Sequence, residues 1–369
     1  MNRSWVCNDV WMDIFPLFDR VELGLNLALL SDRFDVLVDA HFDGREFTIW
    51  REILIRKDIG SKPCVSVRID GKWVEFPLPE HPLPNKIRFN FLRIDYLDYS
   101  VITFLHANKH IWDRMGTKLT LAIWQYENED VQPIWDVLAS ETWHIFATSI
   151  RNLRFTKGDY LDKLRRLISP TILTDLDQLN SIDTDVLFPD AIADDGPNAT
   201  AGQALSKWLH TPSKNGQPKR LFFENYDAEV NLDWVNSFKE VCVWSILIKT
   251  FASATASVSY NIRLQFYGST PIGPFELVNK HTKEKLTLMK HVFYWLLKRC
   301  PISEKAATVQ WENDENWDDK LNTVQFNLWS GGINFIGPLS PPLDEKEKEA
   351  GQNNNEMFST TPGPSGSAE

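Results

Sequence analysis

The chain has 369 residues, and its 39 basic and 50 acidic side chains give a formal net charge of −11 at pH 7. A charge of this sign argues against nonspecific binding to nucleic acids or anionic membranes. Four cysteines lie far apart without a CxxC pair, which argues against a disulfide framework and against a thiolate zinc site. The length predicts a small module joined to one or two larger ones.

No targeting segment is evident in the sequence. Asp9, Asp13 and Asp19 interrupt the first apolar run, unlike a signal peptide, and no apolar stretch approaches membrane-spanning length. We therefore expect an intracellular protein of the cytoplasm, the nucleus or both.

Residues 8–18 predict a first short helix. Asn8 or Asp9 can cap it, and the helical spacing places three apolar side chains on an inward face. These are Val10, Ile14 and Leu17. Pro16 removes a backbone donor, so the helix is expected to bend or to end near Phe15.

Two more helices are expected before residue 43. Asp19 and Glu22 form a capping-box pattern ahead of the leucine-rich stretch 23–30, and Ser31 can cap a third helix over 32–42. The second helix is apolar almost all round, so it needs partners on more than one side. Either the rest of the chain or another protein must cover it.

The order of these elements resembles the F-box, the module that binds the Skp-type adaptor of cullin–RING ubiquitin ligases. The resemblance runs from Val6 to Phe42, and its “LGLNLALLSDRFDVLVDAHF” portion is similar to the version found in an expanded nematode family. One departure is plain, because Val6 and Cys7 stand where the family carries Leu-Pro, and this removes the fixed entry angle that a proline provides. The resemblance implies adaptor contacts at Val10, Ile14, Phe18, Leu23, Leu27, Leu30 and Phe34.

Residues 46–86 are expected to form a β-rich connector. The stretches “EFTIW”, “CVSVRI” and “KWVEF” alternate polar with apolar residues, and “DG” between the last two predicts a hairpin turn. The proline-rich stretch “PLPEHPLPNK” then forms a stiff boundary.

Strand and helix patterns alternate through residues 87–190. The strand patterns are “KIRFNFLRIDYL”, “KLTLAIW”, “HIFATSIRNLRF” and “LNSIDTDVLF”, and the helical patterns between them include “SVITFLHANKHIWDRM”. The strand starts lie roughly thirty residues apart, in the range of βα solenoid repeats such as leucine-rich repeats. The spacing is irregular, so a compact α/β domain is a close alternative.

Residues 191–339 predict a C-terminal α/β domain, and residues 340–369 predict a disordered tail poor in apolar side chains. Helices are expected over “QALSKWLH”, “LDWVNSFKEV” and “EKAATVQWENDENWDDKL”. Strands are expected over “CVWSILIKTF”, “SVSYNIRLQFY”, “FYWLLKR” and “TVQFNLW”, with a hairpin around “HTKE”. Several stretches of this half resemble the region that follows the F-box in the same nematode family, a region taken to recruit the substrate.

The residues that carry chemistry give weak patterns. No phosphate-binding loop, dinucleotide-binding turn, HExxH pair or nucleophile elbow occurs. His106 and His110 have a spacing that can chelate zinc on a helix, but no third ligand is apparent, so an ordinary surface helix is the favoured interpretation. Fifteen tryptophans either form stacking platforms for sugars or fill irregular cores, and their scatter along the chain favours the cores.

Together these patterns predict an α+β or α/β fold: a three-helix F-box over 1–45, a connector, an irregular leucine-rich-repeat-like βα region and a C-terminal α/β domain. They predict no enzymatic activity, no cofactor, no metal, and no nucleic-acid or membrane partner. The resemblance implies a substrate receptor that binds a Skp-type adaptor, a cullin through that adaptor, and a target protein. Two alternatives stay open: an interaction scaffold of the same fold that recruits no ligase, and a carbohydrate-binding protein that uses exposed tryptophans.

Overall fold

The computed structural model describes residues 6–42, 47–58, 61–69, 71–84, 87–123, 130–184, 187–224, 241–265, 273–291, 294–302 and 321–329. The chain divides into two units, residues 1–333 and 334–369, and all described residues lie in the first. The tail predicted over 340–369, and most of the helices predicted over 232–241 and 304–321, lie outside the described residues and stay predictions.

The N-terminal residues form short helices that begin where the sequence places caps. The Asp19 side chain accepts a hydrogen bond from the Val21 N–H at 2.8 Å, and the Ser31 hydroxyl accepts one from the Phe34 N–H at 3.4 Å. The elements are α1 (Asn8–Ile14), the 3-10 turn η1 (Phe15–Leu17), α2 (Arg20–Glu22), the π-turn η2 (Leu23–Leu27), the 3-10 turn η3 (Ala28–Leu30) and α3 (Asp32–His41).

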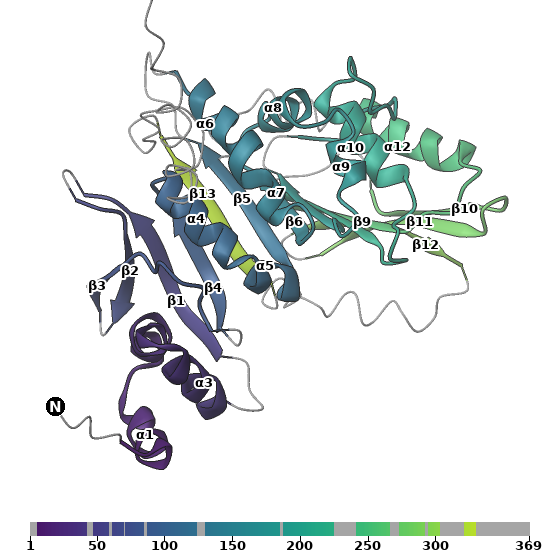
Figure 1. Ribbon diagram of the computed structural model, residues 1–369. Helices are drawn as coiled ribbons and strands as arrows, with labels where there is room; N and C mark the ends of the chain where they lie inside the picture. Colours follow the sequence, from purple (N-terminus) through teal and green to yellow (C-terminus); the bar gives the residue numbers. More distant parts are fainter. Residues whose placement is uncertain are drawn as a thin grey trace, which may run out of the picture. The chain divides into compact units, whose positions relative to one another are not determined.

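A 13-stranded mixed sheet runs through the rest of the unit, in the order β10-β11-β12-β9-β8-β7-β6-β5-β13-β4-β1-β2-β3 (Figure 1). The strands from β9 to β1 in this order pair in parallel, and the strands at both ends pair antiparallel. The strands are β1 (Phe47–Arg56), β2 (Cys64–Ile69), β3 (Lys72–Pro77), β4 (Ile87–Ile94), β5 (Thr117–Ile123), β6 (Ile150–Phe155), β7 (Ser181–Thr184), β8 (Lys219–Glu224), β9 (Tyr260–Gln265), β10 (Phe275–Asn279), β11 (Glu284–Lys290), β12 (Trp295–Pro301) and β13 (Asn322–Leu328).

Helices connect many of these strands. They are α4 (Tyr99–Ala107), α5 (Lys109–Met115), α6 (Gln132–Val137), the π-turn η4 (Leu138–Thr142), α7 (Trp143–Phe146), α8 (Tyr160–Leu167), α9 (Ile172–Asp175), α10 (Ala201–His210) and α12 (Val241–Ser253). Figure 1 shows α4, α5 and α7 in front of the sheet at β4, β13 and β5. Aromatic contacts fix this packing, because Trp112 of α5 lies against Phe89 of β4, and Phe146 of α7 lies against Phe326 of β13.

One continuous apolar row forms the helix-facing side of the sheet. The register pairs one aliphatic residue from each of eight neighbouring strands, and each is at most 1% exposed. The row consists of Leu92, Val324, Leu119, Leu153, Ile182, Leu221, Ile262 and Leu297. Because successive side chains of a strand point to opposite faces, a slip of one residue would move these aliphatic side chains to the other face, so the row specifies the register.

The other face of the same strands is polar. Lys118 forms an ion pair with Asp183 at 3.0 Å between Nζ and Oδ2, and the Asn152 amide donates to Asp183 Oδ1 at 3.2 Å. The Asn327 amide donates to Asp95 Oδ1 at 3.0 Å. Asn152 and Asp183 are buried, so these bonds satisfy the Asn152 amide nitrogen and the Asp183 carboxylate, which would otherwise carry a large desolvation cost.

The mixed α/β class expected from the sequence is confirmed. The “DG” hairpin joins β2 and β3 with Gly71 at φ +80°, and the hairpin around “HTKE” joins β10 and β11. A single sheet runs through residues 46–86, 87–190 and 191–339, the segments that the sequence separates into three regions. Within the described part of the chain, no helix is both long and apolar enough to cross a membrane.

One predicted strand is wrong, and another is wrong in part. Residues 242–251 lie in the helix α12, where Leu247 and Phe251, four residues apart, are both buried. This stretch, although rich in β-branched residues, therefore forms a helix whose buried side chains are four residues apart. Residues 144–146 belong to α7 and only Ile150–Phe155 form the strand β6, so that prediction merged a helix end with the strand after it.

Candidate functional site

The N-terminal helical segment, residues 8–42, has a small core of its own. Phe15, Leu23, Ala28, Leu37 and Val38 are buried together, and several half-buried hydrophobic side chains pack around them. The predicted inward face is buried only in part, because Ile14 is half-buried but Leu17 is 83% exposed, while Phe15 beside it is 0% exposed. The reason is Pro16, which places Phe15–Leu17 in a 3-10 turn and rotates the side chains away from the α-helical spacing.

The seven residues that the resemblance assigns to adaptor contact fall into three classes. Val10, Phe18 and Leu30 are exposed by 46%, 37% and 61% of their surface. Ile14, Leu27 and Phe34 are half-buried. Leu23 is 1% exposed and lies in the core of the segment, so it supports the surface from below.

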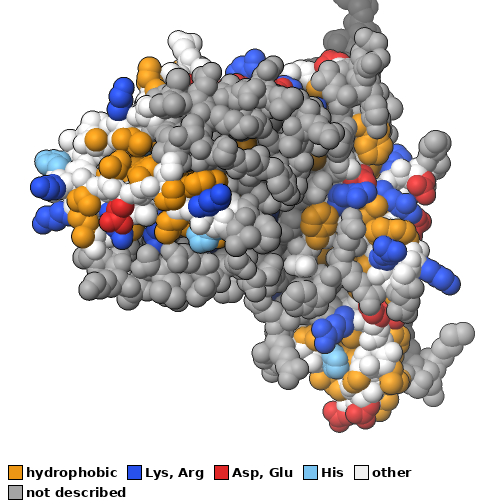
Figure 2. All heavy atoms as spheres, turned by 180° about the vertical axis from the view of Figure 1, so that it is seen from behind, with side chains coloured by type: hydrophobic (Ala, Val, Ile, Leu, Met, Phe, Trp, Pro, Cys, Tyr) orange, Lys and Arg blue, Asp and Glu red, His pale blue; other side chains and the backbone are white. Residues whose placement is uncertain are grey.

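Three further large apolar side chains are exposed on the same segment. They are Val6 at 41%, Leu17 at 83% and Val36 at 66% exposed surface. Figure 2 shows hydrophobic side chains among acidic ones on the surface of these helices. Exposed apolar side chains gathered on one small segment are typical of a protein-binding surface.

Arg33 holds the start of the segment in place. Its guanidinium donates to the Val6 carbonyl at 2.6 Å and to the Asn8 side-chain oxygen at 2.6 and 3.1 Å. These bonds tie the chain ahead of α1 to the first turn of α3. The entry angle that a proline would fix at this position is therefore held by a side chain that the sequence pattern did not single out.

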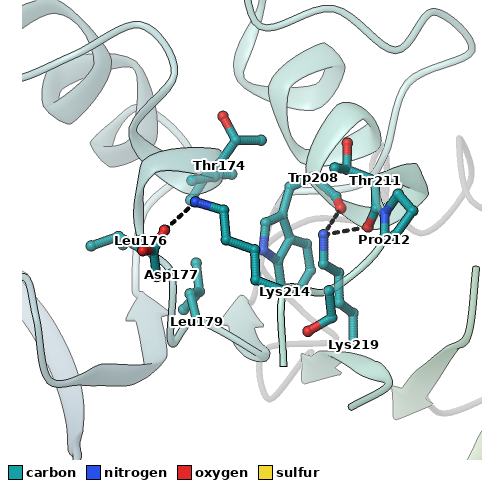
Figure 3. Close-up of a pocket in the computed structure, with 11 residues that line it drawn as sticks. Thr174, Leu176, Asp177, Leu179, Trp208, Thr211, Pro212, Lys214 and Lys219 are labelled. Carbon is teal, nitrogen blue, oxygen red and sulfur yellow. Dashed lines mark hydrogen bonds and ion pairs between the residues drawn. The ribbon is translucent and has the colours of Figure 1, made fainter. Parts of the chain in front are cut away.

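A small pocket lies between α9, α10 and the loop that precedes β8 (Figure 3). Leu173, Leu176 and Trp208 form its apolar lining, and the exposed ion pair between Lys214 and Asp177 lies at its edge. Its cavity volume of about 40 Å³ has room for one or two water molecules but not for a metabolite.

Lys219 closes this pocket from the sheet side. Its ammonium donates to the Trp208 carbonyl and, at 2.7 Å, to the Thr211 carbonyl, and it lies 4.9 Å from the centre of the Trp208 ring. Burial lowers the pKa of Lys219 from 10.5 to about 8. The two carbonyls belong to the C-terminal end of α10, so the amine acts as a cap on the negative end of that helix.

The burial of Lys219 makes stability depend on pH in a specific direction. The folded pKa of about 8 is below the unfolded value, so between pH 8 and 10.5 the unfolded state binds more protons and stability rises with pH. Relative to Lys219→Met, the wild-type free energy of unfolding should increase by about 2 kcal/mol from pH 7 to pH 9.5. Urea unfolding of both proteins across this range measures the difference, and a constant difference would contradict the prediction.

The histidines that the sequence pairs on one helix are separated in the structure. The helix is interrupted at Asn108, so His106 lies in α4 and His110 in α5. Burial lowers the pKa of His110. His106 instead meets His144 of α7, with 3.1 Å between their Nε2 atoms. Burial, followed by the charge of His144, lowers the pKa of His106. No group of three or more His, Cys, Asp and Glu side chains in the described stretches is arranged to hold a metal ion.

Most of the tryptophan side chains that the structure describes fill the interior, as the scatter of tryptophans along the sequence favours. Trp112, Trp135, Trp143, Trp208 and Trp295 are buried. Among the tryptophan side chains that the structure describes, only Trp73, on β3, and Trp329, just after β13, are exposed. A sugar-stacking platform gains no support from this arrangement.

The geometry thus contains a helical segment with exposed apolar side chains, a water-sized pocket with a buried amine, and a paired histidine contact. Neither the pocket nor the histidine pair brings together a nucleophile, a general base and a substrate-sized space. Comparison of the chain with protein-family models, curated proteins and solved structures finds no match.

Proposed function

We propose that this protein is an F-box substrate receptor of a cullin–RING ubiquitin ligase. Its N-terminal helices would bind a Skp-type adaptor, and its C-terminal region would bind a target protein. The observation that carries the proposal is the N-terminal segment, which has its own small core yet exposes Leu17, Leu30 and Val36 by more than half of their surface.

The physical reason is the cost of leaving this apolar surface in water. Fully burying one leucine or valine side chain contributes about 1.5–3 kcal/mol, so an adaptor that covers several of them gains a substantial binding energy. Val10 and Phe18 are also exposed on the same segment, and Asp9 and Asp13 stand between the apolar residues. An apolar centre with charged neighbours is the usual anatomy of a specific protein interface.

The sheet region supports the second half of the proposal. Its parallel strands and connecting helices build one buried row of aliphatic residues, as stacked βα units do, and we interpret it as a leucine-rich-repeat-like platform for the target. The receptor would contribute proximity and no chemistry of its own. It would convert the encounter between ligase and target into an effectively intramolecular step.

The test replaces Leu17 and Leu30 together by aspartate. Both side chains are exposed, so the fold should persist, whereas two carboxylates at the centre of an apolar interface should abolish co-purification with the Skp-type adaptor. The readout is pull-down of purified adaptor, with thermal unfolding to verify that the variant is folded.

A matched control carries the same charges elsewhere. Ile192 and Val278 are 63% and 53% exposed, and replacing both by aspartate should leave adaptor binding intact. Unchanged binding by the Leu17→Asp, Leu30→Asp variant, or an equal loss in the control, would contradict the proposed interface. The first result would favour the interaction scaffold that recruits no ligase.

A further inference from the structure

Two histidines from helices that are distant in the sequence meet at the surface. His106 lies in the last turn of α4 and His144 lies in α7, and both side chains are exposed. Their Nε2 atoms are 3.1 Å apart and their ring centres are 4.8 Å apart. The spacing along a single helix, which pairs His106 with His110, could not reveal this contact.

The packing beneath the pair holds the two helices in a fixed relation. The Lys109 ammonium donates to the Ile145 carbonyl at 2.9 Å and to the Thr148 hydroxyl at 3.2 Å. Below them, the buried rings of Trp112 and Phe146 lie 5.6 Å apart. The relative position of α5 and α7, between which these contacts run, is therefore held by groups other than the two histidines.

The distance between the ring centres distinguishes a straight hydrogen bond between the two nitrogens from an arrangement in which both nitrogens point at a common atom. A straight N–H···N hydrogen bond of 3.1 Å would place the ring centres about 5.3 Å apart, since each centre lies about 1.1 Å behind its nitrogen. If both nitrogens instead lie about 2.05 Å from a common point, as imidazole–zinc bonds require, the expected separation of the centres is about 4.8 Å. The observed 4.8 Å agrees with the convergent arrangement.

The convergence angle also fits metal coordination. With metal–nitrogen bonds of about 2.05 Å, nitrogens at a right angle are about 2.9 Å apart and nitrogens at the tetrahedral angle about 3.4 Å apart. The observed 3.1 Å lies between these values. Glu141 stands one helical turn before His144, and its charge acts on His106 together with the opposite charge of Lys109. A cation here would therefore meet one carboxylate and one ammonium group within electrostatic range.

We propose that His106 and His144 bind a divalent transition-metal ion, Zn²⁺ in particular, through their two Nε2 atoms. Water would complete the coordination, because the pair supplies two ligands. Imidazole nitrogen is a preferred ligand of Zn²⁺ and a poor one for Mg²⁺. Bound metal would link α4 to α7 across the surface. This site is independent of the N-terminal helices and of the proposed adaptor interface.

The test compares the wild-type chain with His106→Gln and His144→Gln, and uses His281→Gln, an exposed turn histidine, as the control. With Zn²⁺ the melting temperature of the wild type and of the control should rise by mass action, and Mg²⁺ should have no effect. Neither single variant should show this rise with Zn²⁺. In the absence of metal, both should have the same melting temperature as the wild type.

A second measurement locates the metal. Addition of Zn²⁺ should shift the Nε2 resonances of His106 and His144 in NMR spectra and leave those of His281 unchanged. Absence of a zinc-dependent rise in the wild type would overturn the proposal. So would a rise that persists in both single variants, because it would place the metal on other side chains.

Discussion

Replacing Arg299 with methionine should lower the free energy of unfolding by about 3–5 kcal/mol, the range found when one partner of a buried ion pair is removed. Arg299 is 1% exposed and Glu284 is 0% exposed. The variant would leave the Glu284 carboxylate buried without its counter-charge. Urea unfolding at neutral pH measures the loss.

The surroundings of this pair explain the size of the effect. Arg299 donates to Glu284 Oε2 at 2.6 and 3.1 Å and to the Ala256 carbonyl at 2.9 Å. The second carboxylate oxygen accepts from the Ser257 hydroxyl and the Val258 N–H, both at 2.8 Å. The pair thus joins β11 and β12 to the chain that leads into β9, and its loss should loosen the antiparallel end of the sheet.

Two controls separate charge burial from lost packing. Adding Glu284→Gln to Arg299→Met should recover part of the stability, because the uncompensated charge disappears. Lys214→Met removes an ion pair whose side chains are 65% and 61% exposed, and it should change stability by no more than about 0.5 kcal/mol. A loss below about 1 kcal/mol for Arg299→Met would show that this pair does not anchor the sheet.

Local patterns predicted most strands because each strand needed one inward aliphatic residue. The stretches “CVSVRI” and “KLTLAIW” alternate or concentrate apolar residues around Val65, Val67, Leu119 and Leu121, and all four side chains are buried. Caps were equally local, since Asp19 and Ser31 bond to backbone groups two and three residues away. Features determined by contacts within about ten residues could therefore be predicted from the sequence.

The order of the strands in the sheet could not be predicted from the sequence, because it depends on contacts between distant segments. The last described strand, β13, inserts between β4 and β5, which follow one another along the chain. No feature of “TVQFNLW” predicts that this strand pairs with β4 and β5. Its buried Val324 and Phe326 would fit beside any parallel strand with a matching inward residue.

Asn108 shows how one side chain can divide a predicted helix. It is fully buried, its amide donates to the Phe104 carbonyl at 2.8 Å, and its oxygen accepts from the Leu83 N–H at 2.8 Å. An asparagine that bonds to backbone groups competes with the helical ladder. The partner at Leu83 lies 25 residues away, so the break between α4 and α5 could not be read from local spacing.

The exposure of the side chains on the N-terminal segment was predicted only in part. Helical periodicity placed Leu17 inside, whereas Pro16 turns it outward. The resemblance placed Leu23 among the contact residues, and the structure has it in the core of the segment. That the resemblance places the adaptor contacts on this segment stays a prediction. The 3-10 and π turns that interrupt the helices determine which side chains face outward, and the helical spacing did not predict these turns.

Replacing Trp112 with alanine should lower the free energy of unfolding by about 3–5 kcal/mol, the range for large aromatic side chains removed from a core. Trp112 is fully buried, and its ring centre lies 5.6 Å from those of both Phe89 and Phe146. It therefore links α5 to the sheet and to α7. Chemical denaturation measures the loss, and Trp73→Ala, at a side chain 43% exposed, should change stability by less than about 1 kcal/mol.

Trp112→Phe separates packing from hydrogen bonding at the same position. The indole N–H donates to the Leu105 carbonyl at 3.2 Å, and phenylalanine keeps an aromatic ring but cannot make this bond. An unsatisfied buried carbonyl costs about 1–3 kcal/mol, so this variant should fall between wild type and Trp112→Ala. Equal losses in both variants would show that the hydrogen bond dominates, and no loss in either would exclude Trp112 as the link between these helices and the sheet.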